Sequence, residues 1–488
     1  MQPLLHRTAS SKARDAIPGV RPEPAARARA APGGELRPGT EAGLTDAATR
    51  RRAAAHPPGL PARQAATLAF ERTLAARLQL DDVLDQQIAA TPGLEGRDAG
   101  LARAIAVTAF RHLGTLSRAI DARLERGASS LPRSVQSILV TAAAQILYLE
   151  AADHAAVDIA VEQTKLQPKG LGFAGVVNAV LRKVAREADA IRHGSDALAH
   201  DTPDWLRASW TAHYGEARAA SMAAAMRDEL ALDITVREDA DGWAGQLGAI
   251  RLPTGSLRLA ARTPVHELPG YDKGAWWIQD AASAVPARLL GVKPGMRVLD
   301  LCAAPGGKTA QLASLGADVT ALDRSSQRLR QLEANLARLN LKAAVVVADA
   351  ATFEAEPFDA VLLDAPCTAT GTIRRHPDVA WTKTPADESK LAALQARLLD
   401  RALNLTRPGG VLVYCTCSLQ PAEGEEQVTA LLARRRDARL APITECEIGV
   451  PGALTARGEF RALPDQLHGE TSRLSGWGGF FAARFVRQ

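Results

Sequence analysis

The sequence predicts a protein of several domains, in which an all-α helical domain precedes a doubly wound α/β domain. Between residues 64 and 186, apolar side chains recur at the spacing of amphipathic helices. From about residue 263, short apolar segments alternate with helical ones, which is typical of a parallel sheet covered by helices. A chain of 488 residues is too long for one compact hydrophobic core, and a prior of about 150 residues per domain suggests about three folded units.

Composition places the chain among soluble cytoplasmic proteins. Hydrophobic residues make up 47% and charged residues 23%, which is ordinary for globular domains, and no apolar run reaches the roughly 18 residues of a membrane span. No signal peptide is recognisable, so we expect no membrane association and reduced thiols. The five cysteines are Cys302, Cys367, Cys415, Cys417 and Cys446.

Residues 1–62 differ from the rest of the chain. They carry ten Lys/Arg against five Asp/Glu, so the remainder is neutral although the whole chain has a net charge of +5. They are rich in Ala, Pro, Arg and Gly and have few large apolar side chains, which predicts a disordered basic tail. The Arg-rich start also fits a targeting sequence, or a translated leader upstream of the true start. A nucleic-acid partner would require a local basic face on the folded part.

The segment 63–190 is predicted to form a helical domain without a catalytic constellation. Gly-containing breaks near 91–100, 127–132 and 168–175 divide it into six or seven helices. Residues 191–262 combine a short helical stretch with alternating segments, which predicts a small α+β connector.

The α/β domain is predicted over 263–488. Its expected strands are VLDL (298–301), VTALD (319–323), AVVVAD (344–349), FDAVLLDAP (358–366) and GVLVYCTCS (410–418). The C-terminal GWGGFFAARFVRQ (476–488) alternates enough to add a last strand.

The first strand runs into a turn of small residues, 302–307, that opens a helix at the carboxyl edge of the sheet, where ligands bind in such folds. A dinucleotide fingerprint G-x-G-x-x-G is absent, and a P-loop would need glycine where Cys302 stands, so NAD and ATP are disfavoured. Asp323 closes the second strand and is suited to both hydroxyls of a ribose. An adenosine ligand without phosphates fits this pattern.

Four consecutive strands each deliver a carboxylate to one rim: Asp300, Asp323, Asp349 and Asp364. Aspartate at one strand end is often ordinary turn chemistry, but four in register favour a binding site. Cys367 and Cys417 each follow a strand, so two thiols converge on the same crevice. A zinc site is disfavoured because no second Cys/His pair lies at ligand spacing, and no metal is expected.

These motifs carry a family resemblance. LDLCAAPGGKT (299–309), LLDAPCTATGTIRRHPD (362–378) and VLVYCTCS (411–418) resemble the signatures of the Nol1/Nop2/Sun family of RNA 5-methylcytosine methyltransferases, whose catalytic domain is a Rossmann-like class I methyltransferase. LPRSVQSILVTAAAQILYLE (131–150), HAAVDIAVEQTK (154–165) and GFAGVVNAVLRKV (172–184) resemble the RNA-binding NusB domain. Together they resemble the branch of RsmB (Sun/Fmu)-type 16S rRNA (cytosine-5) methyltransferases, over about 63–488.

The resemblance implies S-adenosyl-L-methionine as cofactor and assigns residue roles. Cys417, in the Thr-Cys-Ser frame, would attack carbon 6 of the cytosine, Cys367 would assist release, and Asp364 would activate the ring at its N3/N4 edge. From the residues alone the two thiol roles remain interchangeable. The implied cofactor residues are Cys302, Ala303, Ala304, Pro305, Gly306, Gly307, Lys308, Asp323, Asp349 and Asp364.

The expected partner is RNA, most of all 16S rRNA, with no obligate protein partner evident. Alternatives are a tRNA or DNA cytosine-5 methyltransferase and a catalytically idle NusB-like RNA-binding factor. The Thr-Cys-Ser element argues against DNA, and the intact thiols argue against the idle factor. Arg374, Arg375 and His376 either grip phosphates and bases or form a solvated loop.

Overall fold

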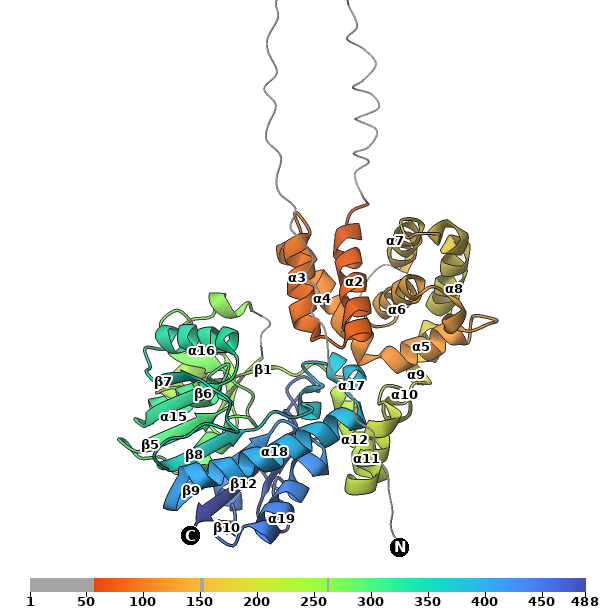
Figure 1. Cartoon of the computed structure of the whole chain (residues 1–488). Coiled ribbons are helices and arrows are strands. Elements are labelled where there is room, and N and C mark those ends of the chain that lie inside the picture. Colours follow the sequence, from red (N-terminus) through yellow and green to blue (C-terminus); the bar gives the residue numbers. More distant parts are fainter. Residues whose placement is uncertain (1–56, 150–152, 261–262) are drawn as a thin grey trace, which may run out of the picture. The chain divides into compact units, whose positions relative to one another are not determined.

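The structure is a computed structural model that describes residues 57–149, 153–260 and 263–488 (Figure 1). The chain divides into two units, Met1–Ala55 and His56–Gln488, and everything below concerns the second. The predicted tail therefore lies outside the described residues except for its last part. There, helix α2 begins at Leu60, three residues before the predicted start of the helical domain, and Leu60 and Ala62 are buried.

Within the described part of residues 60–186 the chain forms seven α-helices, as the helical spacing predicted. They are α2 (Leu60–Ala76), α3 (Leu80–Ala90), α4 (Gly96–Arg111), α5 (Leu113–Asp121), α6 (Arg133–Tyr148), α7 (Asp153–Lys165) and α8 (Ala174–Arg186), with short 3-10 turns η1 (Ala128–Ser130) and η2 (Gly170–Phe173).

Helix α6 is the centre of this domain. Its residues 137–147 are all buried, and it contacts α2, α4, α5, α7 and α8. Alanines at the helix crossings let the backbones approach, while Phe70 and Phe110 fill the core with ring centroids 4.8 Å apart. The hydroxyls of Thr67 and Thr141 satisfy each other at 2.9 Å, so the core leaves these polar groups paired.

A helical linker leads to a small antiparallel sheet. The linker comprises α9 (Ala188–His193), α10 (Ala197–His200), α11 (Asp204–Tyr214) and α12 (Glu216–Met226); the sheet comprises β1 (Leu232–Val236), β2 (Ala249–Arg251), β3 (Leu257–Leu259) and β4 (Trp276–Ile278) with α13 (Ala240–Leu247) and η3 (Val265–Glu267). The strand order is β2-β3-β1-β4, so β4, which follows the predicted boundary at residue 262, completes this sheet. Arg258 on β3 is paired with Asp233 on β1 at 2.7 Å, and both side chains are fully buried.

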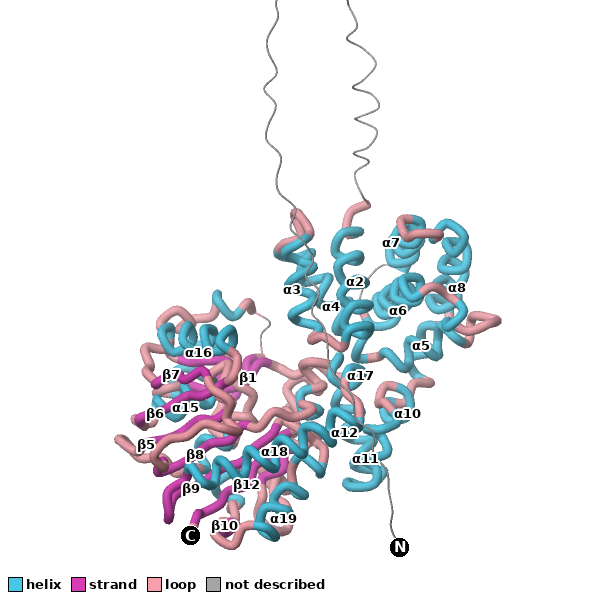
Figure 2. Tube along the Cα trace, viewed as in Figure 1, coloured by secondary structure: helices cyan, strands magenta, loops and turns pink. Residues whose placement is uncertain are grey.

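The second sheet has the order β10-β12-β9-β8-β5-β6-β7, with β11 beside β12. Its strands are β5 (Arg297–Leu301), β6 (Asp318–Asp323), β7 (Ala344–Val347), β8 (Phe358–Asp364), β9 (Thr406–Thr416), β10 (Ala438–Leu440), β11 (Phe460–Ala462) and β12 (Phe480–Arg487). Strands β5 to β9 are parallel and β12 is antiparallel to β9. The predicted doubly wound sheet and its last strand are confirmed, and Figure 2 shows the strands gathered in this C-terminal part.

Helices cover both faces of this sheet. They are α14 (Val285–Leu289), α15 (Gly307–Ser314), α16 (Ser326–Arg338), α18 (Pro385–Leu405), α19 (Glu425–Arg434) and α20 (Glu445–Ile448). Helix α17 (Asp378–Thr382) instead contacts α2 and α4, and two 3-10 turns, η4 (Thr370–Thr372) and η5 (Pro421–Glu423), follow β8 and β9. Alternate residues of a strand point to opposite faces. On β8, Leu362 packs in a cluster with Leu312 of α15, whereas Leu363 packs in a cluster with Leu399 of α18. Figure 1 shows α18 lying across its face of the sheet.

No described helix is both long and apolar enough to cross a membrane.

Candidate active site

The loop between β5 and α15 lines a cavity of about 450 Å³. Gly306 stands at the helix start with φ of 102°, and a Cβ there would lie 2.7 Å from Leu332 on α16, so only glycine fits this turn without strain. The cavity is lined by Tyr271, Trp277, Ile278, Gln279, Ser283, Asp300, Ala303, Ala304, Pro305, Gly306, Gly307, Lys308, Ala310, Gln331, Asn335, Arg338, Leu339 and Asp364. The cavity is therefore bounded by the loop after β5, by the small antiparallel sheet and by α16.

Asp300, at the end of β5, is fully buried and borders this cavity. Its Oδ2 accepts the hydroxyl of Thr309 at 2.6 Å, whereas its Oδ1 has no hydrogen-bond partner among the described residues. Burial raises the pKa of Asp300 to about 7, more than the Thr309 bond lowers it. A buried acceptor without a donor favours a ligand with a cationic or N–H group in the cavity.

Lys308 and Asp364 form an ion pair across the crevice, with Nζ 2.7 Å from Oδ2. Burial alone would lower the pKa of Lys308, but the Asp364 carboxylate and its neighbours outweigh burial and raise that pKa. Lys308 is therefore a buried, charged partner rather than a solvated lysine at a helix start. The Asp364 side chain stays about one-third exposed and borders the cavity.

The other predicted cofactor residues take different positions. Asp323 is buried and accepts the backbone N–H of Ala304 at 3.3 Å, so it supports the loop from the adjacent strand. Asp349 is exposed two residues beyond β7 and accepts the N–H of Ala351 at 2.9 Å; neither aspartate lines the cavity. Cys302 packs against the core beneath the loop, and burial raises the pKa of its thiol, which fits a packing role.

The two predicted catalytic thiols lie together: Sγ of Cys367 is 3.5 Å from Sγ of Cys417. Each follows the end of its strand and is half-buried. The hydrogen bond with Cys417, and then burial, raise the pKa of the Cys367 thiol. Cys415 lies within β9 opposite Asp364, is fully buried, and donates its thiol to Asp364 Oδ1 at 3.6 Å. The crevice pair is therefore Cys367 and Cys417.

Backbone contacts join the two thiol loops. Gly371 donates its N–H to the carbonyl of Cys417 at 2.9 Å, and Gly479, just before β12, donates to the carbonyl of Gly371 at 2.8 Å. A Cβ on Gly371 would lie 1.9 Å from the carbonyl oxygen of Gly479. The glycine of the Pro-Cys motif is thus required by this close backbone approach.

The basic segment after the Pro-Cys loop is used internally. Arg374 is buried and donates to the carbonyls of Ser475 and Ser472 at 2.8 and 3.2 Å, and Arg375 donates to Asp280 at 3.0 Å. Burial contradicts both sequence-based interpretations, a phosphate grip and a solvated loop, for Arg374. Arg375 is partly exposed and His376, which is exposed, lies 3.0 Å from Asp81, so their contact with RNA stays a prediction. The sequence does not show that the N–H groups of Arg374 and Arg375 bind backbone carbonyls and Asp280.

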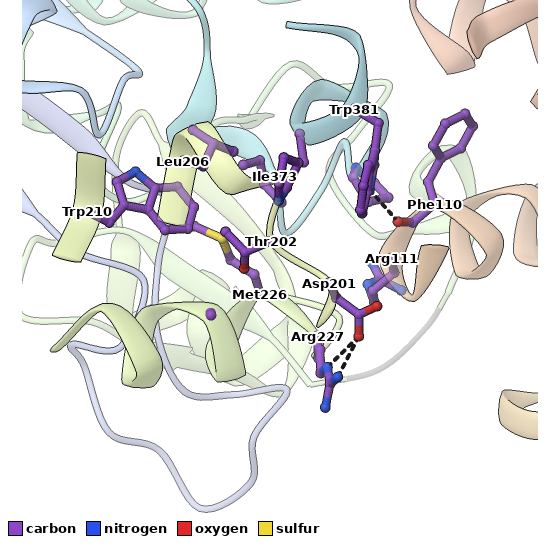
Figure 3. Close-up of a pocket in the computed structure, with 14 residues that line it drawn as sticks. Phe110, Arg111, Asp201, Thr202, Leu206, Trp210, Met226, Arg227, Ile373 and Trp381 are labelled. Atoms are coloured by element: carbon purple, nitrogen blue, oxygen red, sulfur yellow. Dashed lines mark hydrogen bonds and ion pairs between the residues drawn. The ribbon is translucent and has the colours of Figure 1, made fainter. Parts of the chain in front are cut away.

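The helical domain and linker contact this segment directly. Trp381 of α17 donates its indole N–H to the carbonyl of Phe110 at 3.0 Å, and the backbone N–H of Leu80 donates to Asp378 at 3.2 Å. In Figure 3, Phe110 and Trp381 lie beside the linker pair Asp201 and Arg227, whose Oδ2 and Nε are 2.8 Å apart. The segment following Cys367 is therefore held by the N-terminal half of the described chain.

Among the described residues, no group of three or more His, Cys, Asp or Glu side chains is arranged to hold a metal ion.

Comparison with known proteins places this site in a family. The family model described as 16S rRNA methyltransferase RsmB/F matches residues 287–485, and the NusB family model matches residues 60–186. A protein of Shewanella oneidensis named ribosomal RNA small subunit methyltransferase B is 32% identical over 77% of this chain and 92% of its own length. The chain belongs to the RsmB/F family of 16S rRNA methyltransferases. The family and the NusB-like domain predicted from the motifs are confirmed.

Other members of the RsmB/F family agree with this result. A relative of the same name from Vibrio vulnificus is 35% identical over 72% of this chain and 86% of its own length. Among solved structures, that of PH0851 superposes with a TM-score of 0.67 at 23% identity, covering 88% of this chain and 99% of that one. The structure of NSun6 from Pyrococcus horikoshii with SFG has a TM-score of 0.51 at 21% identity, covering 58% and 98%. At these identities the solved structures support the fold alone.

Two residues of the RsmB/F site were not assigned roles from the sequence. Asp300 was counted as one of four strand-end carboxylates, and only the structure isolates its unpaired oxygen. Glu423 lies in the acidic stretch after Cys417, and its side chain is fully buried. No sequence signal distinguishes it from its neighbours Glu425 and Glu426.

Proposed function

We propose that this member of the RsmB/F family methylates carbon 5 of a cytosine in 16S rRNA through a covalent adduct with Cys417. The observation that carries the proposal is the 3.5 Å approach of two thiols, Cys367 and Cys417, at strand ends beside Asp364. A single buried cysteine would serve packing, whereas two partly exposed thiols in contact suit a reaction with separate attack and release steps.

Carbon 5 of cytosine is too weak a nucleophile to accept a methyl group directly. In the proposed reaction the Cys417 thiolate forms a bond to carbon 6, and the electron pair moves to carbon 5. After carbon 5 has gained the methyl group it loses its proton to a base, and the electrons of that bond expel the thiolate, which breaks the sulfur–carbon bond. Cys367, 3.5 Å from the attacking sulfur, assists this release.

At the N3/N4 edge of the ring, Asp364 is proposed to accept a hydrogen bond from the N4 amino group as the thiolate adds. Its Oδ2 is held by Lys308 and its Oδ1 accepts the thiol of Cys415 at 3.6 Å, so the carboxylate has one fixed orientation. A charge-assisted contact of this kind orients the group without preventing a further hydrogen bond, because a carboxylate has about four acceptor positions.

The cavity bordered by Asp300, Lys308 and Asp364 fits S-adenosyl-L-methionine. Its volume of about 450 Å³ suits a nucleoside-sized ligand, and the unpaired Oδ1 of Asp300 suits the amino group of the methionine part. Ala303 to Lys308 would surround the ligand with backbone, and Cys302 would support them from below. Asp323 lies behind this loop and holds it through the N–H of Ala304; its contact with the ribose hydroxyls is proposed from the family resemblance. When bound, this cofactor supplies an electrophilic methyl group on a positively charged sulfur. Asp349 is included in the proposed site through its place at the same sheet edge.

The proposed substrate is RNA in which the target cytosine leaves its stack to enter the crevice. The names of the bacterial relatives, which specify small-subunit ribosomal RNA, support 16S rRNA. We propose that the domains predicted at 63–190, 191–262 and 263–488 serve RNA binding, connection and catalysis; in the structure the first begins at Leu60 and the sheet of the second is completed by β4. The contacts of Phe110 and Leu80 with the segment after Cys367 would place RNA held by the helical domain close to the thiols.

The test is methyl transfer from labelled S-adenosylmethionine to unmodified bacterial 16S rRNA, with tRNA and duplex DNA alongside and the product mapped by bisulfite sequencing. We expect one protected cytosine in 16S rRNA. Label in tRNA alone would show that the substrate is tRNA instead of 16S rRNA. Label at a position other than carbon 5 would refute the thiol chemistry. A Cys417→Ala variant with unchanged activity would refute the adduct.

A further inference from the structure

Glu423 is a fully buried carboxylate at the end of η5 with an unusual set of partners. Its Oε1 accepts the backbone N–H of Thr368 at 2.9 Å and the amide of Gln395 at 3.1 Å. Its Oε2 accepts the hydroxyl of Ser418 at 2.6 Å and also the hydroxyl of Thr368. All these donors are uncharged, and within the part of the chain that the structure describes this carboxylate forms no ion pair.

Two of the partners have a special position in the chain. Thr368 directly follows Cys367, and Ser418 directly follows Cys417. One carboxylate therefore bridges the two loops that carry the thiols. Both partners are fully buried, so these bonds lie beneath the crevice rather than in it.

Further contacts fix Glu423 itself. Gln395 of α18 also donates to the carbonyl of Pro366 at 2.8 Å, and the hydroxyl of Tyr414 donates to the backbone carbonyl of Glu423 at 2.8 Å. Burying a carboxylate without a cationic partner costs free energy. An apolar contact between the two thiol loops would avoid this cost. A carboxylate differs from an apolar contact in that it fixes several donors at defined distances.

We propose that Glu423 is a positioning residue that holds Cys367 and Cys417 at the separation required for attack and release. It does not touch substrate, because its side chain has no exposed surface and both oxygens are engaged. The role in the reaction rests on the proposed cysteine mechanism, whereas the role in thiol geometry does not. The two claims are therefore tested by different measurements.

The geometry is tested with phenylarsine oxide, which condenses with two neighbouring thiols to form two arsenic–sulfur bonds and one water. Wild-type protein and the variants Glu423→Ala, Glu423→Gln and Cys367→Ala are titrated, and the bridged species is counted by intact mass spectrometry. The control is Glu459→Ala, because Glu459 is also fully buried but its carboxylate is held by Thr455 and Arg457, which belong to neither thiol loop. Thermal unfolding and S-adenosylhomocysteine binding are measured for every variant.

We expect wild type and Glu459→Ala to be bridged, Cys367→Ala to lose bridging, and Glu423→Ala to bind the arsenical about 10-fold more weakly as the thiols separate. Glu423→Gln should retain bridging, because its oxygen still accepts from Thr368 and its amide can donate to the two hydroxyls. Methyl transfer by Glu423→Ala should fall about 100-fold in kcat with an unchanged KM for S-adenosylmethionine, since a shift of about 1 Å costs about that factor.

Wild-type bridging by Glu423→Ala, or an equal loss in Glu459→Ala, would overturn the proposal. Where Glu423→Ala does not fold, Ser418→Ala removes one donor and must weaken bridging by itself. A wild-type protein that is bridged but makes no 5-methylcytosine would refute the proposed function and leave the geometric role of Glu423 standing. Wild-type turnover by Glu423→Ala with normal 5-methylcytosine formation would refute only the positioning role.

Discussion

Replacing Asp300 by asparagine tests the cavity most directly, because the structure leaves the Oδ1 of this buried carboxylate without a partner. In the free protein burial raises the pKa of Asp300 to about 7 from an ordinary value of 3.8. Its protonated form therefore dominates below about pH 7. A ligand ammonium group requires the ionised form, so cofactor affinity should rise as the pH rises through this range.

The magnitude follows from the pKa. With a pKa of about 7, the ionised fraction of Asp300 is about 0.09 at about pH 6 and about 0.9 at about pH 8, a ratio of about 10. If only the ionised form binds well, the dissociation constant should fall about 10-fold between these values, which corresponds to about 1.4 kcal/mol. The same sign governs stability: this carboxyl favours the folded state below its ordinary pKa of 3.8, and that contribution is lost as the pH rises to about 7.

The assay is calorimetric titration of S-adenosylhomocysteine from about pH 6 to pH 8, in two buffers of different ionisation enthalpy that report proton release. Asp300→Asn keeps an oxygen for the hydroxyl of Thr309 but does not titrate, so its affinity should be weaker and independent of pH. A flat wild-type profile, or the same slope in wild type and variant, would refute the assignment of Asp300 to the ligand.

Three further predictions concern the thiols and the segment between them. Cys417→Ala should abolish turnover and Cys367→Ala should leave an RNA–protein adduct that survives denaturing electrophoresis; an adduct formed only by Cys417→Ala would reverse the roles. Gly371→Ala places a Cβ 1.9 Å from a carbonyl, so chemical denaturation should show a loss of about 1–3 kcal/mol; an unchanged midpoint would contradict this packing. The bond to Asp81 raises the pKa of His376 above its ordinary 6.5, so this contact is fully present below that value and is lost as the pH rises through the raised pKa. The protection of α3 against hydrogen exchange should then fall from about pH 6 to pH 8 in wild type but not in His376→Ala.

The sheet and its cofactor edge were predictable because both follow from local patterns. Short apolar runs ending in aspartate define parallel strands, and parallel strands place their carboxyl ends at one edge. The meeting of Cys367 and Cys417 was predictable for the same reason, since β8 and β9 are adjacent in the sheet. The family motifs then separated Cys417 from Cys415, which the structure places inside β9.

The fate of polar side chains was less predictable, because it depends on partners that are remote in sequence. Arg374 looked available for RNA until the structure showed the carbonyls of Ser472 and Ser475 beside it, about 100 residues away in the chain. Glu423 received no role from the sequence, because its partners Thr368 and Ser418 belong to two other segments of the chain. Hydrophobic periodicity records which face is buried, but it does not record which polar group a long-range contact will satisfy.

These remote contacts explain why the helical part and the catalytic sheet are useful on one chain. Trp210 of α11 donates its indole N–H to Gln420 at 2.9 Å, and Tyr214 donates its hydroxyl to the carbonyl of Leu419 at 2.7 Å, so the linker holds the residues just after the Cys417 loop. The helical domain holds the segment after Cys367 through Phe110. Each thiol loop is thus supported by a different N-terminal element and joined to the other by a buried carboxylate. In the proposed function, RNA bound by the helical part would therefore lie on the same elements that contact the residues following both thiols.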